Sequence, residues 1–337
     1  MDPRPPSLRE LAAKLGVSHA TVSMALRNNP AISPATRERV QALARKMNYR
    51  GNILVSALLT QVRSRRVNAT GEVIAMLIEG TGFHHAPVLA SFWDITQQRA
   101  REIGMKLELF PLGHRGKDSA SVGRVLFNRG IRGLIIAPMP LDLLPLQIDW
   151  SLHAVVALGY SFSQKEMNRV ANAHFGGLLT CYRELRAAGH RRIGCVMRRD
   201  EDARSRHYWQ AAALCAPRLH GGAGIAPLML KDGQGEEEFA KWFLRHSPDA
   251  VIGNHPDHAV DWLRRCGARI PADVGYASLD RAAGAAFPGV QQSWEDIFTT
   301  AVEQLAGELA RNEFGLPAMP KTTLVEGRWR ESGGSAP

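Results

Sequence analysis

Basic side chains gather at the N-terminal end of this 337-residue chain, and the chemistry they offer is the binding of anions. Residues 1–66 hold twelve Lys or Arg residues and three acidic residues, a net charge of +9, while the whole chain carries +10. The other 271 residues, with 30 basic and 29 acidic side chains, therefore carry only +1. A basic segment joined to a neutral body is typical of a module that sits on phosphates while the rest has another task. The charge distribution thus predicts a nucleic-acid partner.

A short helical pattern after Ser18 carries side chains suited to reading bases. Its apolar positions face inward, and its outer face holds His19, Ala20, Ser23 and Met24, with Thr21 and Arg27 toward the DNA backbone. In a helix-turn-helix the second helix enters the major groove with its N-terminal residues toward base edges. The alternative is a small structural bundle with solvated polar residues. Caps, spacing and charge agree with one another and favour the DNA-binding interpretation.

Residues 7–50 contain the signals for three helices that would position these side chains. Ser7-x-x-Glu10 is a capping box, and Gly16 supplies the left-handed residue that ends a helix. Ser18 is the N-cap of the second helix, and Ser33 followed by Pro opens the third. Apolar residues recur at helical spacing and would form the shared core: Leu8, Leu11, Ala12, Leu15, Val22, Ala25, Leu26, Val40, Leu43, Ala44 and Met47. We therefore predict a three-helix unit.

Three stretches of this unit form a specific pattern: VSHATVS at 17–23, AISPATRERV at 31–40 and NYRGN at 48–52. The pattern resembles the N-terminal signature of the LacI/GalR family of bacterial transcription regulators. Met24 stands where that family usually has an Arg that reads guanine, and Gly51 replaces its usual Pro. Met24 offers only apolar contact, such as to a thymine methyl group. We expect DNA contacts from Ser7, Leu8, Ser18, His19, Ala20, Thr21, Ser23, Met24, Arg27, Ser33, Thr36, Asn52 and Leu58.

Residues 51–69 would form a hinge and linker after this domain, which we place at residues 1–50. The stretch NILVSALLTQVRSRR at 52–66 is an apolar helical pattern that ends in three arginines. The resemblance implies that it folds on DNA and that Leu58 inserts between base steps of the minor groove, a wedge that bends the duplex. Arg63, Arg65 and Arg66 suit phosphates or a narrowed minor groove. A plain linker with Leu58 packed on the core is the alternative.

Residues 70–332 alternate between apolar runs and helical patterns. Strands are expected at 72–78, 106–112, 133–139 and 153–159, and again at 192–197, 226–230 and 250–253. Helices are expected between them at about 87–103, 119–129, 175–188, 205–215 and 237–245. Such alternation indicates βαβ units and a mainly parallel sheet. Because the rhythm restarts after residue 168, we predict two α/β lobes with a cleft between them, where open sheets bind ligands.

The resemblance extends loosely over this body, through AAGHRRIG at 187–194, DAVIGN at 249–254 and IPADV at 270–274. It implies a fold similar to that of periplasmic sugar-binding proteins, used for effector binding and dimerisation, with three crossings between the lobes. The N-lobe would be about 70–166 and 293–318, and the C-lobe about 167–290 and 319–332. Residues 333–337 would be a disordered tail. The expected fold is an all-α helix-turn-helix domain followed by a two-lobed α/β domain.

Several residues of the body match effector contacts of the resembling family: His85, Arg206, Asn254, Asp280 and Trp294. Arg, Asn and Asp can orient neighbouring hydroxyls, and an aromatic ring can stack on a sugar face. Arg206 could instead pair with a surface acid, and Trp294 could belong to the core. His255 departs from the family's usual Asp, and Gly159 and Ala173-His174 lie where it often has polar ligand contacts or structural acids. The effector could therefore be unusual or absent.

Other chemistries find little support in the sequence. Gly80-Thr-Gly82 lacks the third glycine of a dinucleotide loop, and His255-x-Asp257-His258 is more often a surface pattern than a metal site. No Ser/His/Asp constellation can be defended from spacing, so we expect neither an enzyme nor a cofactor. Cys181, Cys195, Cys215 and Cys266 form no C-x-x-C pair and are expected to be reduced thiols. No signal peptide or membrane-spanning run is evident.

These observations predict a cytoplasmic, effector-controlled transcription repressor that binds a near-palindromic operator as a homodimer. One helix-turn-helix buries too little surface for tight specific binding, so two half-sites are expected. The effector would be a small molecule, most simply a sugar. One alternative is a regulator whose body binds a non-sugar ligand or a partner protein. The other is a solute-binding or enzymatic α/β protein in which the N-terminal helices are only accessory.

Overall fold

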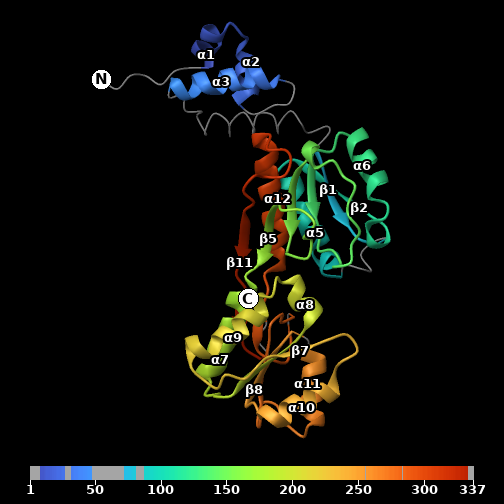
Figure 1. Ribbon diagram of the computed structural model, residues 1–337, viewed down its shortest axis with the longest axis vertical. Coiled ribbons are helices and arrows are strands. Elements are labelled where there is room, and N and C mark those ends of the chain that lie inside the picture. Colours follow the sequence, from blue (N-terminus) through green and yellow to red (C-terminus); the bar gives the residue numbers. More distant parts are fainter. Residues whose placement is uncertain are drawn as a thin grey trace, which may run out of the picture.

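A small helical head and a two-lobed α/β body make up the protein (Figure 1). The computed structural model describes residues 8–26, 32–47, 72–80, 87–254, 256–282 and 284–332. The expected hinge helix, the capping serine Ser7 and the C-terminal tail lie outside these residues. Within the described part of the chain, no helix is both long enough and apolar enough to cross a membrane.

The head contains the three predicted helices, α1 (Leu8–Leu15), α2 (His19–Leu26) and α3 (Pro34–Lys46). Their inward faces meet in a shared apolar core that includes the fully buried Leu11, Val22 and Ala25. Gly16 lies between α1 and α2 with φ +64°, the left-handed conformation that its position after the first helix predicted. The periodic apolar residues therefore build the small core that fixes α2 in place.

The N-lobe is a six-stranded parallel sheet with the order β11-β5-β4-β3-β1-β2. Helices α5 (Pro87–Glu102) and α12 (Trp294–Arg311) pack on one face, and α6 (Ser119–Asn128) packs on the other. Two 3-10 turns, His114–Gly116 and Trp150–Leu152, lie in its connections. The strands are β1 (Glu72–Ile78), β2 (Met105–Pro111), β3 (Gly133–Ile136), β4 (Ala154–Leu158), β5 (Asn168–Asn172) and β11 (Thr322–Val325).

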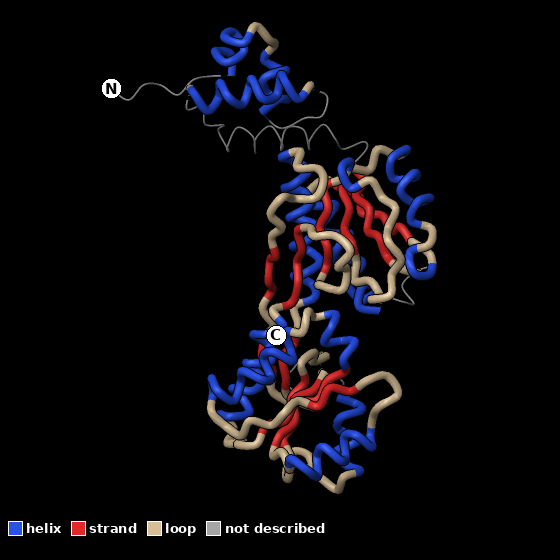
Figure 2. Tube along the Cα trace, viewed as in Figure 1, coloured by secondary structure: helices blue, strands red, loops and turns tan. Residues whose placement is uncertain are grey.

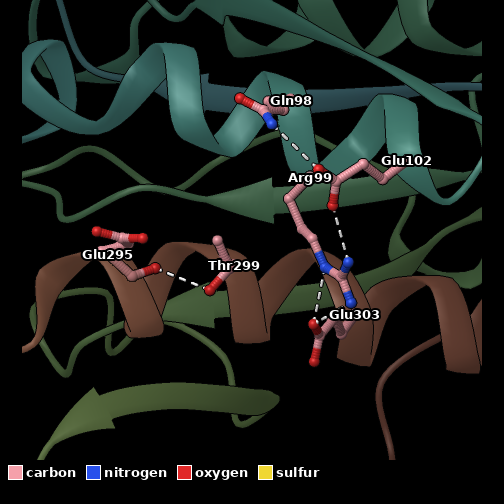
Figure 3. Close-up of polar contacts among 6 residues, drawn as sticks. All are labelled: Gln98, Arg99, Glu102, Glu295, Thr299 and Glu303. Carbon is pink, nitrogen blue, oxygen red and sulfur yellow. Dashed lines mark hydrogen bonds and ion pairs between the residues drawn. The ribbon is translucent and has the colours of Figure 1, made fainter.

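Polar contacts join the two helices on the first face of this sheet (Figure 3). Arg99 of α5 donates from Nε to Glu303 Oε1 of α12 at 2.8 Å and pairs with Glu102 of its own helix at 2.9 Å. Beneath them, Phe92 stacks against Phe298 with ring centroids 6.0 Å apart. Exposed ion pairs contribute only about 0–1 kcal/mol. The buried apolar face of α12, which includes Ile297, Phe298 and Leu305, is therefore its main attachment to the N-lobe.

The C-lobe repeats the architecture with the strand order β12-β10-β9-β8-β6-β7, in which only β12 is antiparallel to its neighbour among the described pairs. Helices α7 (His174–Ala187) and α9 (Tyr208–His220) pack on one face, and α10 (Glu236–His246) and α11 (Pro256–Arg265) on the other. The strands are β6 (Ile193–Arg198), β7 (Leu228–Leu230), β8 (Ala250–Gly253), β9 (Gly275–Ser278), β10 (Gly289–Gln291) and β12 (Arg328–Arg330).

The chain passes between the lobes three times, and the two sheets are separate in Figure 2. The predicted lobe boundaries need correction at two of these crossings. Strand β5 was assigned to the C-lobe but pairs with β4 and β11 in the N-lobe sheet, so the first crossing follows residue 172. Strand β11 also belongs to the N-lobe, which moves the third crossing from about residue 318 to the short link between β11 and β12.

Three elements differ from the sequence-based expectation for a physical reason. The helix expected near 205–215 begins only at Tyr208, because Arg206 and His207 adopt left-handed φ values of +55° and +62°. These residues separate α9 from a short unpredicted helix, α8 (Arg199–Arg204). Strand β5 was missed because it contains Asn168, Arg169 and Asn172, which break the apolar pattern of a buried strand.

Candidate DNA-binding surface and effector cleft

The helices of the head that would meet DNA begin at hydroxyl caps. The Ser18 hydroxyl accepts from the Thr21 backbone N–H at 3.0 Å, and the Ser33 hydroxyl accepts from the Thr36 N–H at 3.3 Å. The two side-chain hydroxyl groups in each pair are also hydrogen-bonded, at 2.8 and 2.9 Å. Exposed hydroxyls at helix N-termini, where the backbone dipole favours negative charge, suit contacts to phosphates.

Met24 is half-buried on α2, while Val22 and Ala25 face the core. This arrangement agrees with the predicted division of α2 into an inner and an outer face. With Ser18, Thr21, Ser33 and Thr36, Met24 is one of five predicted DNA contacts whose side chains the structure describes. Ser7, Arg27, Asn52 and Leu58 lie outside the described residues, as do the side chains of Leu8, His19, Ala20 and Ser23.

Three of the predicted effector residues, Arg206, Asn254 and Asp280, belong to the C-lobe, and Trp294 begins α12 of the N-lobe. His85 lies outside the described residues. Arg206 follows α8 at the lobe boundary and reaches across to the N-lobe. Its Nη2 lies 3.4 Å from Glu166 Oε1, and its guanidinium carbon lies 5.4 Å from the ring centre of Tyr160. Arg206 therefore does pair with an acid, as the alternative proposed, and that acid, Glu166, belongs to the other lobe.

Asn254 follows β8 and lines a pocket in the C-lobe. Its amide donates to a carboxylate oxygen of Glu201 in α8. The pocket has a volume of about 190 Å³ and is lined by Val196, Met197, Arg198, Leu230, Gln234, Asn254, His258, Ala259 and Trp262. Asn254 is the only predicted effector residue among these described lining residues.

Asp280 and Trp294 lie at the ends of two other segments that lead to the cleft. Asp280 follows β9, is half-buried, and donates its backbone N–H to the Ser278 hydroxyl at 3.3 Å. Trp294 begins α12 and packs against the N-lobe core, 6.4 Å from Phe298 between ring centres. Its observed contacts match the core alternative, and its stacking on a ligand stays a prediction.

Buried polar atoms without a hydrogen-bond partner concentrate where the chain crosses between the lobes. Within the described part of the body there are four: Arg169 Nη2, Asn172 Oδ1, His174 Nδ1 and Gln292 Oε1. They lie in or beside the first two crossing segments. Buried polar groups are almost always satisfied, because an unpaired one costs about 1–3 kcal/mol. The polar interior of the body is therefore concentrated at the lobe crossings.

An aromatic cluster surrounds these atoms and joins the two lobes. Tyr160 of the N-lobe lies 5.4 Å from Tyr208 and 6.2 Å from His174, measured between ring centres. His174 in turn meets the edge of Trp209 at 4.8 Å. Burial lowers the pKa of His174 to about 4, so its ring is neutral at physiological pH. Burial also raises the pKa of Tyr160 to about 12.

Sequence reasoning missed most of this cluster. It pointed to Gly159 and His174 only as departures from a family pattern, and it did not identify Arg169, Tyr160 or Trp209. One signal was available for Arg169. Arg169 lies in the mixed run MNRVANA, and a basic residue needs a partner if that run is a buried strand.

Two family models match the chain in separate regions. Residues 7–52 match the bacterial regulatory proteins of the lacI family, and residues 182–331 match the periplasmic binding protein-like domain. An HTH-type transcriptional regulator of Mycobacterium tuberculosis (strain ATCC 25618 / H37Rv) is 32% identical over 39% of this chain and 34% of its own length. The HTH-type transcriptional repressor CytR of Escherichia coli (strain K12) is 22% identical over 81% of this chain and 80% of its own length.

Solved structures share the whole arrangement of head and body. A complex of the transcriptional regulator CelR with cellobiose covers 98% of this chain and 100% of its own, with a TM-score of 0.59 and 20% identity. The lac repressor dimer bound to operator and the anti-inducer ONPF covers 99% of this chain and 100% of its own, with a TM-score of 0.56 and 16% identity. These likenesses confirm the predicted fold class, a helix-turn-helix head followed by a periplasmic-binding-protein-like body.

Proposed function

The chain is a member of the lacI family of bacterial regulatory proteins, and we propose that it represses genes of carbohydrate use in response to a sugar. As a DNA-binding transcriptional regulator, it divides its work between two parts. The basic head holds the operator, and the neutral body senses the effector. The observation that supports an effector is the group of unpartnered buried atoms at the lobe crossings.

On DNA, the protein works as a homodimer that places two heads on a near-palindromic operator. Each head presents α2 to a major groove, with the caps Ser18 and Ser33 near phosphates. Leu58 of the hinge enters the minor groove, and Arg63, Arg65 and Arg66 hold the backbone beside it. The lac repressor dimer, whose fold this chain shares, was solved on its operator.

In the body, the sugar binds between the lobes and changes their relative placement. The residues that hold it are Arg206, Asn254, Asp280, Trp294 and His85. Because all three crossings link the lobes, a shift at the cleft moves the N-lobe that carries the hinge. The result is a coupling free energy between effector and operator, typically about 1–3 kcal/mol. The likeness to a regulator solved with cellobiose supports a carbohydrate.

The protein acts without catalysis, and it acts in the cytoplasm, where its DNA target lies. Its relatives are named as transcriptional regulators and repressors. Operator binding and effector binding are therefore the two measurable activities, and they occupy separate parts of the chain.

Selection of duplexes from a random pool, followed by anisotropy titrations with a sugar panel, tests this proposal. We expect one near-palindromic motif and at least one sugar that changes its affinity. Asp280→Ala should abolish the sugar response and keep operator binding, because Asp280 lies in the body. Asp261→Ala, an exposed acid on α11, is the matched control and should keep both. Failure to enrich any motif would contradict the proposed function.

A further inference from the structure

Arg169 of β5 is a charged side chain enclosed in the N-lobe, with only 1% of its surface exposed. Its Nη1 donates to the carbonyl oxygens of Gly159 at 3.0 Å and Phe162 at 3.4 Å. Its Nη2 is buried and has no hydrogen-bond partner. Among the described residues, no carboxylate comes within 4 Å of this guanidinium. A buried cation with a free donor and no counter-ion is costly unless something else completes it.

Arg281 shows how this chain builds a buried arginine for structure alone. It is 2% exposed and likewise has no ion pair within the described part of the chain, yet all three of its guanidinium nitrogens donate to carbonyl oxygens. Ala285 and Glu331 share Nη2, while Phe287 and Ala282 take the other two nitrogens. In Arg169, Nη1 donates to carbonyl oxygens but Nη2 has no hydrogen-bond partner. A purely structural role therefore does not explain both of these nitrogens.

A second guanidinium, that of Arg206, contacts the same ring as Arg169. The guanidinium carbons of Arg169 and Arg206 lie 5.6 and 5.4 Å from the ring centre of Tyr160. The two charges repel, since burial and then the charge of Arg206 lower the pKa of Arg169. Because Arg206 comes from the C-lobe and Arg169 from the N-lobe, this pair of cations spans the lobe boundary.

The acids nearby do not neutralise the two cations. Glu166 contacts Arg206 at a long 3.4 Å, and its side chain is 64% exposed. Asp202 is fully buried but is already occupied, by His207 Nδ1 at 2.8 Å and the Gln210 N–H at 3.0 Å. One exposed carboxylate against two guanidinium groups leaves a positive site at the boundary.

Flat rings complete this site. Tyr208, 38% exposed, meets Tyr160 edge-on, and His174 lies between Tyr160 and Trp209. Aromatic faces pack on the C–H surface of a sugar ring, and guanidinium forks match the oxygens of carboxylate and phosphate groups. The combination of rings and cations therefore selects for charge and for a sugar skeleton together.

We propose that Arg169 and Arg206 bind the anionic group of a negatively charged carbohydrate, a carboxylate or a phosphate ester on a polyhydroxylated skeleton. The inference rests on the proposed function, because it names the chemical class of effector for the same cleft. The aromatic cluster of Tyr160, Tyr208, His174 and Trp209 holds the skeleton while the two cations hold the charge. Binding draws both lobes onto one ligand.

The test uses the full-length protein and sets of probes that share a skeleton. Calorimetry and thermal unfolding are measured with glucose, glucuronate, gluconate and glucose 6-phosphate, and with the corresponding galactose series. We expect an anionic member to bind at least about tenfold more tightly than its neutral parent, since hydrogen bonds to charged groups are stronger than those between neutral groups. The acid and phosphate members distinguish the two sources of negative charge.

Variants locate the effect. Arg206→Met, at an exposed position, should weaken binding of the anionic probe about 10- to 100-fold and weaken binding of its neutral parent by a clearly smaller factor. Arg169→Lys keeps the charge but removes the second donor nitrogen. It should also weaken binding of the anionic probe more than binding of the neutral parent. Arg218→Met, an exposed cation near the other end of α9, is the matched control and should change neither.

Three outcomes would overturn the inference. They are tighter binding of neutral sugars than of their anionic partners, no binding by any anionic member, and equal losses for both probes in Arg206→Met. None of these touches operator binding. The proposed function fails separately, if the same preparation enriches no operator from the random duplex pool.

Discussion

At the scale of single residues, His174 links the cleft to the stability of the fold. Burial lowers its pKa from 6.5 to about 4, so folding favours the neutral ring. This contribution is complete above pH 6.5 and is lost as the pH falls toward 4, because the unfolded chain takes up the proton first. The loss amounts to roughly 3 kcal/mol at most.

His174→Gln should therefore lose less stability than the parent on going from about pH 7 to about pH 4, as measured by urea unfolding at each pH. His153 is the matched control, because burial lowers its pKa too and its Nδ1 lies 2.9 Å from the Ile131 carbonyl oxygen. In His153→Gln, the share of the acid-induced loss of stability that is due to His174 should persist. An acid-induced loss in His174→Gln equal to that of the parent would contradict the buried, neutral state.

Met24 is the residue for which base preference can be tested most directly. Its half-buried side chain on α2 offers no bidentate contact to guanine. Met24→Arg should shift the selected operator toward guanine at one symmetric pair of positions, by about 1–3 kcal/mol. Ala13→Arg adds the same charge at an exposed site on α1 and should raise affinity without a new preference. Recovery of the parental motif with Met24→Arg would show that this residue faces no base.

Single residues also show where sequence reasoning reached its limit. Arg206 and Asn254 were identified because each matches an effector contact of the resembling family, and the structure gives both a polar contact with an acidic side chain. Arg169 was not, since its meaning depends on Gly159 and Tyr160, which the fold brings beside it. Contacts that arise only from the tertiary fold, with no fixed spacing along the chain, cannot be found from one sequence.

At the scale of elements, the periodic segments were predicted well and the polar ones were not. Strands such as β1 and β8 consist of continuous apolar residues, and their positions matched expectation. Strand β5 and the break between α8 and α9 depend on tertiary contacts that override local pattern. These misses lie at the lobe boundary, where Arg206 has a left-handed backbone and Arg169 is a buried cation, features that function explains better than propensity.

The turn between α1 and α2 gives a testable consequence at this scale. Gly16 has φ +64°, and a Cβ added there would meet nothing within 4 Å. The cost of Gly16→Ala is therefore conformational, about 1–2 kcal/mol. It should lower the melting temperature of the head and weaken operator binding by destabilising α2.

Gly224→Ala provides the comparison for that variant. Gly224 also has open space around an added Cβ, but its φ lies outside the left-handed range. The same exchange there should be neutral or stabilising by about 0.4–1 kcal/mol, because it restricts the unfolded chain. Equal effects of the two exchanges on thermal unfolding would contradict a requirement for left-handed backbone at Gly16.

At the scale of the whole molecule, charge and sensing occupy different parts of the chain. Residues 1–66 carry nearly all of the net positive charge, and the body is close to neutral. A neutral body adds little non-specific attraction to DNA. Changes in operator affinity can therefore act through the hinge alone. Of the two cations at the lobe boundary, Arg169 is buried and Arg206 contacts Glu166, so they add little further surface for phosphates.

This separation predicts where the salt dependence of operator binding resides. Replacing Arg63, Arg65 and Arg66 together with Gln should weaken binding to every duplex, because a protein that neutralises fewer phosphates releases fewer counter-ions from the DNA. The slope of log K against log salt should flatten by up to about 0.9 for each phosphate no longer neutralised, measured by anisotropy from low to moderate salt. Replacing three exposed arginines of the C-lobe, Arg183, Arg245 and Arg264, removes the same charge and should leave the slope unchanged. A slope that responds equally to both triple variants would mean that total charge, rather than contact through the hinge, holds this protein on DNA.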